Sequence, residues 1–308
     1  MMMRNPRTNS FSSFNSVTLV GLAALLGSCE SPESEPTVDL GAEVSLGDGS
    51  VQSFHVHDES GSVAIGVRLS AAALQNLPTE DSDGRYDVLD GEDIVLACCG
   101  HEIIIPLPSG VADETPFQSI VLNYNPHGHG PPDVYDREHI DFHFYTIGES
   151  ERMGILGTQD AAEMCLDISL VDSSFPPIPV PMTCEQVELT TQPLPEDQQP
   201  PGYVSVGAVE PAMGNHLIDP TAPEFNGTAF SDTFIYGSHA GELVFLEPMV
   251  TLEKLLGLSG RECHDIAMPE SFPDAGSYPT QYCIEYLAAE EVYEVSMEGF
   301  VDYPASGG

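Results

Sequence analysis

Residues that could hold a metal ion are concentrated in one short stretch of the sequence, HIDFHFY at residues 139–145. His139, Asp141 and His143 alternate there with apolar residues. In a β-strand, successive side chains point to opposite faces, so the three polar side chains would share one face. Neutral imidazoles and carboxylates are suitable ligands for Zn²⁺, Mn²⁺ or Fe²⁺. The pattern therefore predicts a divalent transition-metal site on one face of a strand.

A regular strand cannot supply both of these histidines to the same ion. Side chains two residues apart lie roughly 7 Å apart along a strand, and His139 and His143 are separated by about twice that. Either a bulge brings the two histidines together, or His139 or His143 binds the ion with Asp141 and a third group from another segment. His129, on a Gly/Pro loop, and His216, in the motif MGNH, are candidates, and Glu247 would join them if strands from the two halves of the chain pair. The predicted ligands come from this set: His129, His139, Asp141, His143 and His216.

Two kinds of function are compatible with this arrangement. If the site is catalytic, the metal would polarise a bound water or a substrate oxygen, and Asp141 or Tyr145 would handle the proton. Alternatively, the histidines form a structural hydrogen-bond network with Asp and Tyr side chains, in a non-enzymatic assembly or binding module. The residue pattern leaves both hypotheses open.

Several motifs around these residues are similar to those of a known family. The sequence contains NPHGHGPPDVY, HIDFHFY, MGNH and EPM. It resembles an uncharacterised bacterial exported family with a TTHB-type domain of unknown function, whose members read NPxGHxPPxxY, HxDFHFY, MGxH and EPM. The resemblance covers roughly residues 41–302, with Ile140 in place of the usual Phe and Leu217 in place of the usual Trp. It implies no reaction, but it singles out four residues: His129, Asp141, His143 and His216.

The elements that must position these residues are mostly strands. Short runs rich in Val, Ile, Phe and Tyr, bounded by Gly, Pro, Asn or Asp, recur along the chain and predict strands. They lie at residues 51–57, 63–69, 94–98, 103–107, 119–124, 139–147, 203–209, 230–236, 243–246, 281–287 and 292–301. Helix signals are fewer and lie at residues 70–75, 149–155 and 251–256.

These elements predict an α+β, β-rich fold with a mainly antiparallel sheet and a few short helices. We expect a single domain over residues 41–303, because neither half of the chain has an obvious complete core. A Pro-rich stretch at residues 191–202 is either a long surface connection within this domain or a sub-domain break.

Six cysteines lie in the expected domain, and an even number in an exported chain predicts disulfides. Their spacing favours two local pairs, each closing a loop of about 20 residues that would contribute roughly 3 kcal/mol. The pairs are Cys165 with Cys184 and Cys263 with Cys283. The adjacent cysteines at residues 98–99 form either a vicinal disulfide or two buried thiols.

The N-terminus has the features of an export signal. Two arginines precede an apolar run over residues 17–26, and small residues follow. The run is too short to span a bilayer, so residues 1–28 are predicted to be a signal peptide. The sequence LGSC ends at Cys29 and resembles the bacterial lipobox, in which lipid is attached to the cysteine. Residues 29–40 would form an acidic, Pro-rich tether, so we expect a lipid-anchored protein of the bacterial cell envelope that faces the periplasm or the cell surface.

The charge of the chain limits its partners. Its 308 residues include 49 acidic and 8 basic side chains, a formal net charge of −41, and removal of the predicted signal peptide takes away two arginines and leaves −43. Nucleic acids bind to patches of Lys and Arg, so we expect no nucleic-acid partner. The sequence indicates a membrane partner through the lipid anchor, and it leaves a homo-oligomer open.

Overall fold

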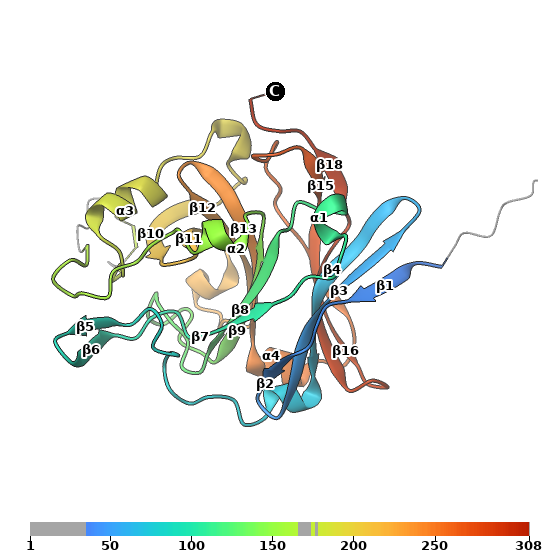
Figure 1. Ribbon diagram of the computed structural model, residues 1–308, viewed down its shortest axis with the longest axis horizontal. Helices are drawn as coiled ribbons and strands as arrows, with labels where there is room; N and C mark the ends of the chain where they lie inside the picture. The colour runs from blue at the N-terminus through green and yellow to red at the C-terminus, as the bar shows by residue number, and fades with distance from the viewer. Residues whose placement is uncertain (1–34, 166–173, 176–177, 308) are drawn as a thin grey trace, which may run out of the picture. The chain divides into compact units, whose positions relative to one another are not determined.

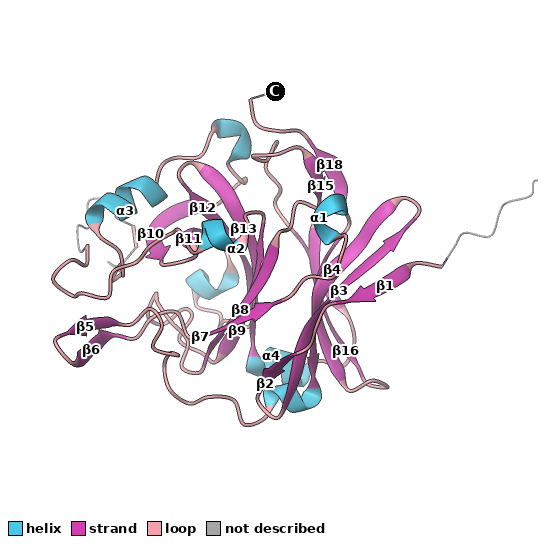
Figure 2. Ribbon diagram, viewed as in Figure 1, coloured by secondary structure: helices cyan, strands magenta, loops and turns pink. Residues whose placement is uncertain are grey.

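The computed structural model describes residues 35–165, 174–175 and 178–307, all within one compact unit of the chain (Figure 1). The predicted signal peptide at residues 1–28 and the predicted lipidation site, Cys29, lie outside the described residues. The structure is β-rich with antiparallel sheets, as the sequence predicts (Figure 2). Among the described helices, none has the length and apolar character needed for a bilayer span.

The first of two large sheets joins the beginning and the end of the described chain. Its strand order is β1-β3-β4-β17-β16-β14, and β2 also pairs with β3. The strands are β1 (Thr37–Leu40), β2 (Val44–Leu46), β3 (Gly49–Asp58), β4 (Gly61–Ser70), β14 (Glu262–Asp265), β16 (Gln281–Leu287) and β17 (Val292–Glu298). The sequence analysis places Thr37–Leu40 in the tether, whereas in the structure these residues pair with β3 as an edge strand. The folded part of the chain therefore begins before residue 41.

The second large sheet carries the candidate site. Its strand order is β10-β11-β12-β13-β9-β8-β7, and all of its neighbours are antiparallel. The strands are β7 (His101–Ile105), β8 (Ser119–Asn125), β9 (His139–Tyr145), β10 (Val204–Glu210), β11 (Gly214–Ile218), β12 (Asp232–His239) and β13 (Glu242–Thr251). The sequence predicts every strand of this sheet except β11, because Gly214 and Asn215 interrupt its apolar pattern. The sheet thus joins strands from both sides of the Pro-rich stretch at residues 191–202.

The remaining elements are short. Two small sheets pair β5 (Val88–Asp90) with β6 (Asp93–Leu96) and β15 (Gly276–Tyr278) with β18 (Val301–Tyr303). The helical segments are η1 (Ala71–Leu74), α1 (Val111–Glu114), α2 (Glu149–Arg152), α3 (Cys184–Thr190), η3 (Glu196–Gln198), η4 (Pro223–Asn226) and α4 (Leu252–Gly257). Three of them, η1, α2 and α4, coincide with predicted helix signals, and all lie at the edges of the sheets or in connections.

The main apolar core lies between the two large sheets. Ile140, Phe142 and Phe144 form the inner face of β9 and are fully buried in one cluster with Val67 of β4 and Val295 of β17. Burial of each such side chain stabilises the fold by about 1.5–3 kcal/mol. The alternation in HIDFHFY therefore fixes which face of β9 meets the first sheet, and the polar residues must point the other way.

The outward face of β9 is buried as well. All seven residues of β9 and all seven of β8 are buried. Smaller apolar clusters and loops cover this side of the second sheet, including one cluster that contains Tyr135, Phe230 and Met249. The polar residues of β9 therefore lie in a second interior and not on the molecular surface.

Three cysteine pairs are joined in the structure. Cys165 is bonded to Cys184 and Cys263 to Cys283, the two pairs that the spacing favours, and the adjacent cysteines at residues 98–99 are also bonded to each other. The Cys263–Cys283 bond connects directly opposed residues of β14 and β16. Disulfides persist in oxidising compartments, so these bonds indicate an extracytoplasmic location.

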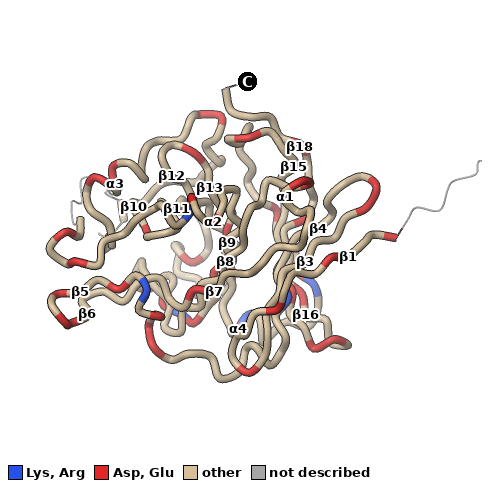
Figure 3. The backbone as a smooth tube through the Cα atoms, in the orientation of Figure 1, with Lys and Arg blue, Asp and Glu red and all other residues tan. Residues whose placement is uncertain are grey.

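Acidic residues are distributed along the whole described backbone, whereas basic residues are few (Figure 3). Each Lys and Arg in the described part of the chain forms an ion pair with an acidic side chain. No described basic residue is therefore left over to form a phosphate-binding patch.

One of these ion pairs is fully buried beneath the second sheet. The guanidinium of Arg152 is inaccessible to solvent and lies 2.8 Å from the Glu149 carboxylate and 2.9 Å from that of Glu102. It also donates to the carbonyl of Ala212 at 3.0 Å and lies over the ring of Tyr145. Arg152 thereby connects α2 and β7 to the strand that carries the candidate site.

We expect the Arg152→Met variant to lose up to about 3 kcal/mol of unfolding free energy, because the Glu102 carboxylate is 1% exposed and would keep only the partly exposed Arg85 as a charged partner. Arg261→Met is the matched control, because Arg261 is 43% exposed and its pairs with Glu285 and Glu298 lie at the surface. That variant should lose less than about 1 kcal/mol. Chemical denaturation of the two purified variants measures both values, and equal losses would contradict the prediction.

Candidate functional site

Three strands and one loop bring the candidate residues to the outward face of the second sheet. β9 supplies three of them, the loop between β8 and β9 supplies a fourth, and β11 and β13 supply one each. In chain order they are His129, His139, Asp141, His143, His216 and Glu247. β13 pairs with β9 so that Leu246 lies opposite Phe144. The next residue of β13, Glu247, therefore lies beside His143.

The six side chains form two groups of three, and in each group the potential ligand atoms lie within 4.8 Å of one another. We refer to His129, His139 and Asp141 as the Asp141 group, and to His143, His216 and Glu247 as the Glu247 group. The five residues predicted from the sequence all lie on this face, but they do not form one site. His139 and His143 belong to different groups, as the geometry of a regular strand predicts.

The Asp141 group balances its own charge. Nε2 of His139 lies 3.0 Å from one carboxylate oxygen of Asp141, and Nε2 of His129 lies 3.5 Å from the other. Asn125 donates a hydrogen bond of 2.7 Å to the same carboxylate. Burial disfavours the charged form of Asp141, but the two neighbouring histidines outweigh burial and lower its pKa. Desolvation likewise opposes the charged form of His129, but Asp141 raises its pKa, so the buried Asp141 carboxylate is paired with a partly exposed histidine.

The Glu247 group is not balanced in this way. Nε2 of His143 and Nε2 of His216 lie 3.5 and 3.8 Å from the two carboxylate oxygens of Glu247, and the three side chains are 1%, 13% and 2% exposed, respectively. Within the described part of the chain, neither ring nitrogen of His143 nor Oε2 of Glu247 has a hydrogen-bond partner. A buried polar atom without a partner costs about 1–3 kcal/mol, so native proteins contain few of them. A ligand that contacts both histidines and the carboxylate would satisfy these atoms.

Electrostatics explain why these three residues do not form an ion pair with each other. Burial lowers the pKa of His143 to about 3 and that of His216 to about 4. Burial, together with the negative charge of Asp141, raises the pKa of Glu247 well above its ordinary value. Both imidazoles are therefore neutral at pH 7, and a neutral imidazole is the form that binds a metal ion.

The distances in the Glu247 group match a coordination site better than a hydrogen-bond network. Two ligand atoms that each lie about 2.1 Å from a tetrahedral ion are roughly 3.4 Å apart. The separations of 3.5 and 3.8 Å are close to this value and longer than a normal hydrogen bond. One ligand atom from each of the three residues also lies within 4.8 Å of the other two, which is compatible with binding around one ion.

Backbone carbonyls orient three of the four histidines. Nδ1 lies 2.5–3.1 Å from a backbone carbonyl oxygen in His129, His139 and His216. A carbonyl oxygen only accepts hydrogen bonds, so Nδ1 carries a proton and Nε2 faces the carboxylates. Metal-binding histidines are commonly held in this way, because the bond to the second nitrogen fixes both the tautomer and the ring orientation.

The ring of Phe245 packs against both histidines of the Glu247 group, whose rings also meet edge to face. The ring of Phe245 lies 4.9 Å from that of His143 and 5.3 Å from that of His216. Gly237 pairs with Phe245 on one side and with His216 on the other. A Cβ atom at Gly237 would lie 1.9 Å from the Phe245 ring, so the absence of a side chain there makes room for the phenylalanine.

A cavity of about 570 Å³ adjoins both groups and is large enough for a small molecule. His129, Asp141 and His216 line it, together with Glu210 and the adjacent cysteines at residues 98–99. Burial raises the pKa of Glu210 to about 7. The rest of the wall is largely apolar and includes Val206, Met213, Ile218, Phe225 and Ile235.

Tyr145 is not placed for the role that the sequence analysis considers. Its hydroxyl donates to the carbonyl of Ala212 at 3.3 Å, and burial raises its pKa well above the ordinary value. It does not line the cavity, and its ring stacks on His143 instead. Asn125, by contrast, is a contact that the sequence analysis did not identify, although it is the first residue of the NPxGH motif.

Comparisons with protein-family models, with curated proteins and with solved structures return no match. The resemblance to the TTHB-type family therefore stays a prediction from motifs.

We expect the Gly237→Ala variant to lose about 1–3 kcal/mol of unfolding free energy, because the added methyl group must displace the ring of Phe245. Gly257→Ala is the control, since a Cβ atom at Gly257 meets nothing within 4 Å and the residue lies in α4. Its stability should be unchanged or slightly increased, because alanine favours helices over glycine. Thermal and denaturant unfolding measure both variants, and a Gly237→Ala protein as stable as the wild type would show that Phe245 is not fixed by this contact.

Proposed function

We propose that this protein is a lipid-anchored envelope protein that binds one divalent transition-metal ion, Zn²⁺, Mn²⁺ or Fe²⁺, through His143, His216 and Glu247. The observation that carries the proposal is the set of buried, unpartnered atoms in the Glu247 group. A divalent ion at this position would contact both neutral imidazoles and compensate the buried carboxylate. The Asp141 group lies next to it as a charged neighbour, in which two histidines stabilise the carboxylate.

The proposed ligand set leaves coordination positions open. Three protein ligands plus water or substrate is the usual composition of a catalytic metal site, whereas structural zinc sites have four protein ligands. His216, one of the three ligands, also lines the cavity, so a small molecule bound there could reach the open positions. An ion at this site could polarise a water molecule or a substrate oxygen. Asp141 lines the same cavity and raises the pKa of Glu247, so it is a carboxylate outside the ligand set that could handle the proton.

The location is part of the same proposal. The disulfides indicate an oxidising compartment. The predicted signal peptide and the lipobox-like sequence that ends at Cys29 add export and membrane attachment, with the lipid as the link to the membrane. The motif resemblance to an exported bacterial family agrees with this location.

A second candidate function rests on the Asp141 group. Its ion pairs and its bond from Asn125 stabilise the Asp141 carboxylate, although Oδ1 of Asp141 has no hydrogen-bond partner among the described residues. If the whole histidine motif behaves in this way, the protein is a non-enzymatic assembly or binding module of the envelope, and the histidines only stabilise the fold. The two functions differ in which carboxylate matters: metal binding depends on Glu247, whereas the structural network depends on Asp141.

Metal analysis of variants distinguishes the two functions, because each function depends on a different carboxylate. We expect the purified wild-type protein to retain about one Zn²⁺, Mn²⁺ or Fe²⁺ ion per chain after dialysis, and the Glu247→Gln variant to retain none, because Gln removes the anionic ligand with little change in shape. Asp141→Asn is the matched variant of the other group and should keep the ion. His127→Ala controls for loss of any histidine, since His127 is 68% exposed and lies in neither group. A wild-type protein without stoichiometric metal, or a Glu247→Gln protein with it, would overturn the proposal.

Removal of the ion should lower the melting temperature, because an ion that binds only the native state stabilises it. With free metal at about 100 times its dissociation constant, this stabilisation is about 2.7 kcal/mol. Calorimetric melts with and without chelator measure the effect, and the His143→Ala protein should show none. If His143→Ala unfolds the protein equally in both conditions, and chelator leaves the wild-type melt unchanged, the structural network is the correct function.

A further inference from the structure

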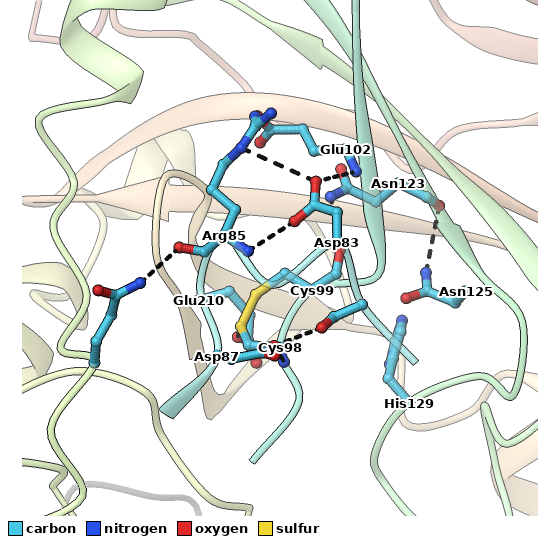
Figure 4. The surroundings of a disulfide bond; sticks show 12 residues. Asp83, Arg85, Asp87, Cys98, Cys99, Glu102, Asn123, Asn125, His129 and Glu210 are labelled. Atoms are coloured by element: carbon cyan, nitrogen blue, oxygen red, sulfur yellow. Dashed lines mark hydrogen bonds and ion pairs between the residues drawn. A yellow bond between two sulfur atoms is a disulfide. The ribbon is translucent and has the colours of Figure 1, made fainter. Parts of the chain in front are cut away.

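The adjacent cysteines and Glu210 form a third cluster of potential metal ligands (Figure 4). All three residues line the cavity. Oε2 of Glu210 lies 3.2 Å from Sγ of Cys98 and 3.2 Å from Sγ of Cys99. The carboxylate comes from the end of β10, and the two cysteines precede β7, so distant parts of the chain meet here. None of these residues belongs to the Asp141 group or the Glu247 group.

The backbone presents both sulfur atoms on the same side. In an extended chain, adjacent side chains point in opposite directions. Cys99 has φ 74°, in the left-handed region that residues with a side chain rarely adopt, and this turn brings its sulfur next to that of Cys98. The amide of Cys98 donates to the Asp87 carboxylate at 3.0 Å, and the carbonyl of Cys99 accepts from Asn123 at 2.8 Å. Such unfavourable conformations persist where surrounding contacts hold them and are concentrated at functional sites.

The position of Glu210 is difficult to explain if the two sulfur atoms are always bonded to each other. A sulfur atom in a disulfide carries no proton, so it cannot donate a hydrogen bond to the carboxylate. Among the described residues, no Lys or Arg forms an ion pair with Glu210. In the dithiol form, both S–H groups could donate to Oε2. With a cation bound, the two thiolates and the carboxylate would all act as ligands.

We infer that Cys98, Cys99 and Glu210, in the dithiol form, are a second metal site that binds one thiophilic cation such as Cu⁺, Zn²⁺ or Cd²⁺. Thiolate ligands select soft cations, whereas the imidazoles and carboxylate of the Glu247 group suit harder divalent ions. The site opens when a dithiol reductant passes two electrons and two protons to the disulfide, which yields two thiols, while the reductant becomes a disulfide. Binding of the cation then displaces the thiol protons.

Cadmium is a suitable probe, because only its thiolate complexes absorb in the near ultraviolet by charge transfer from sulfur. We expect the full-length wild-type protein, reduced with a dithiol under conditions that leave Cys165–Cys184 and Cys263–Cys283 intact and then freed of reductant without air, to bind one extra Cd²⁺ with this absorption. The oxidised protein should not show it. The Cys98→Ser/Cys99→Ser variant should lose the absorption after the same treatment, and thiol titration should find two thiols fewer than in the reduced wild type.

Two further variants make the test decisive. Glu210→Gln keeps both sulfur atoms and should bind Cd²⁺ at least about tenfold more weakly, with the absorption retained at high concentration. Glu247→Gln should show the full absorption, so failure of the proposed Glu247 site would not affect this result. The inference is overturned if reduced wild type and the double variant give the same spectrum, if the cysteine pair resists reduction until the chain unfolds, or if Glu210→Gln binds as tightly as the wild type. Should the double variant fail to fold, the affinity of Glu210→Gln decides.

Discussion

The structure depends on the burial of both faces of β9. Every residue of this strand is buried, although alternate residues are polar. The apolar face packs on the first sheet, as in any two-sheet fold, and its burial fixes the direction of the other face. A one-residue change of register would place His139, Asp141 and His143 in the apolar core, where they would have no partners. The strand therefore has one stable register, and that register delivers the polar side chains into a second, enclosed interior.

Polar groups in such an interior must be satisfied by the protein or by a ligand. The chain does this differently at the two ends of the strand. Near its start, the loop histidine, His129, and the side chain of Asn125 supply contacts that let Asp141 remain ionised. Near its end, Glu247 and aromatic rings surround His143, and neither of its ring nitrogens has a hydrogen-bond partner among the described residues. The row of polar side chains on β9 is thus divided into a part in which histidines stabilise an ionised carboxylate and a part that an ion would complete.

The sequence predicts the strands and the row of polar side chains on β9, because both follow from the local alternation of polar and apolar residues. It also predicts that His139 and His143 cannot share an ion, which depends only on the rise of a strand. It does not predict the grouping, because Glu247 and His216 reach the ladder through the order β11-β12-β13-β9, and strand order is not encoded in any single segment. The missed strand, β11, illustrates the same limit: Gly214 and Asn215 weaken the local signal, but pairing with β10 and β12 compensates for it.

Surface charge attracts cations to this protein over a long range, whereas buried ligands select among them at short range. A net charge of −41, with every described basic residue already paired, gives a surface field that attracts cations in general and does not distinguish among them. Exposed carboxylates of this kind suit Ca²⁺ and Mg²⁺, which take oxygen ligands. Discrimination must occur where the ligands are buried and nitrogen-rich, because dehydrating a hard cation for two imidazoles is unfavourable, whereas transition metals accept them. The low pKa values of His143 and His216 keep these rings neutral well below pH 7, so protons do not compete with the metal at the imidazoles. At Glu247, whose pKa is raised by burial, the metal would displace a proton instead. Burial makes unpartnered polar side chains on β9 unfavourable without a ligand. The same burial therefore also makes the site selective among cations.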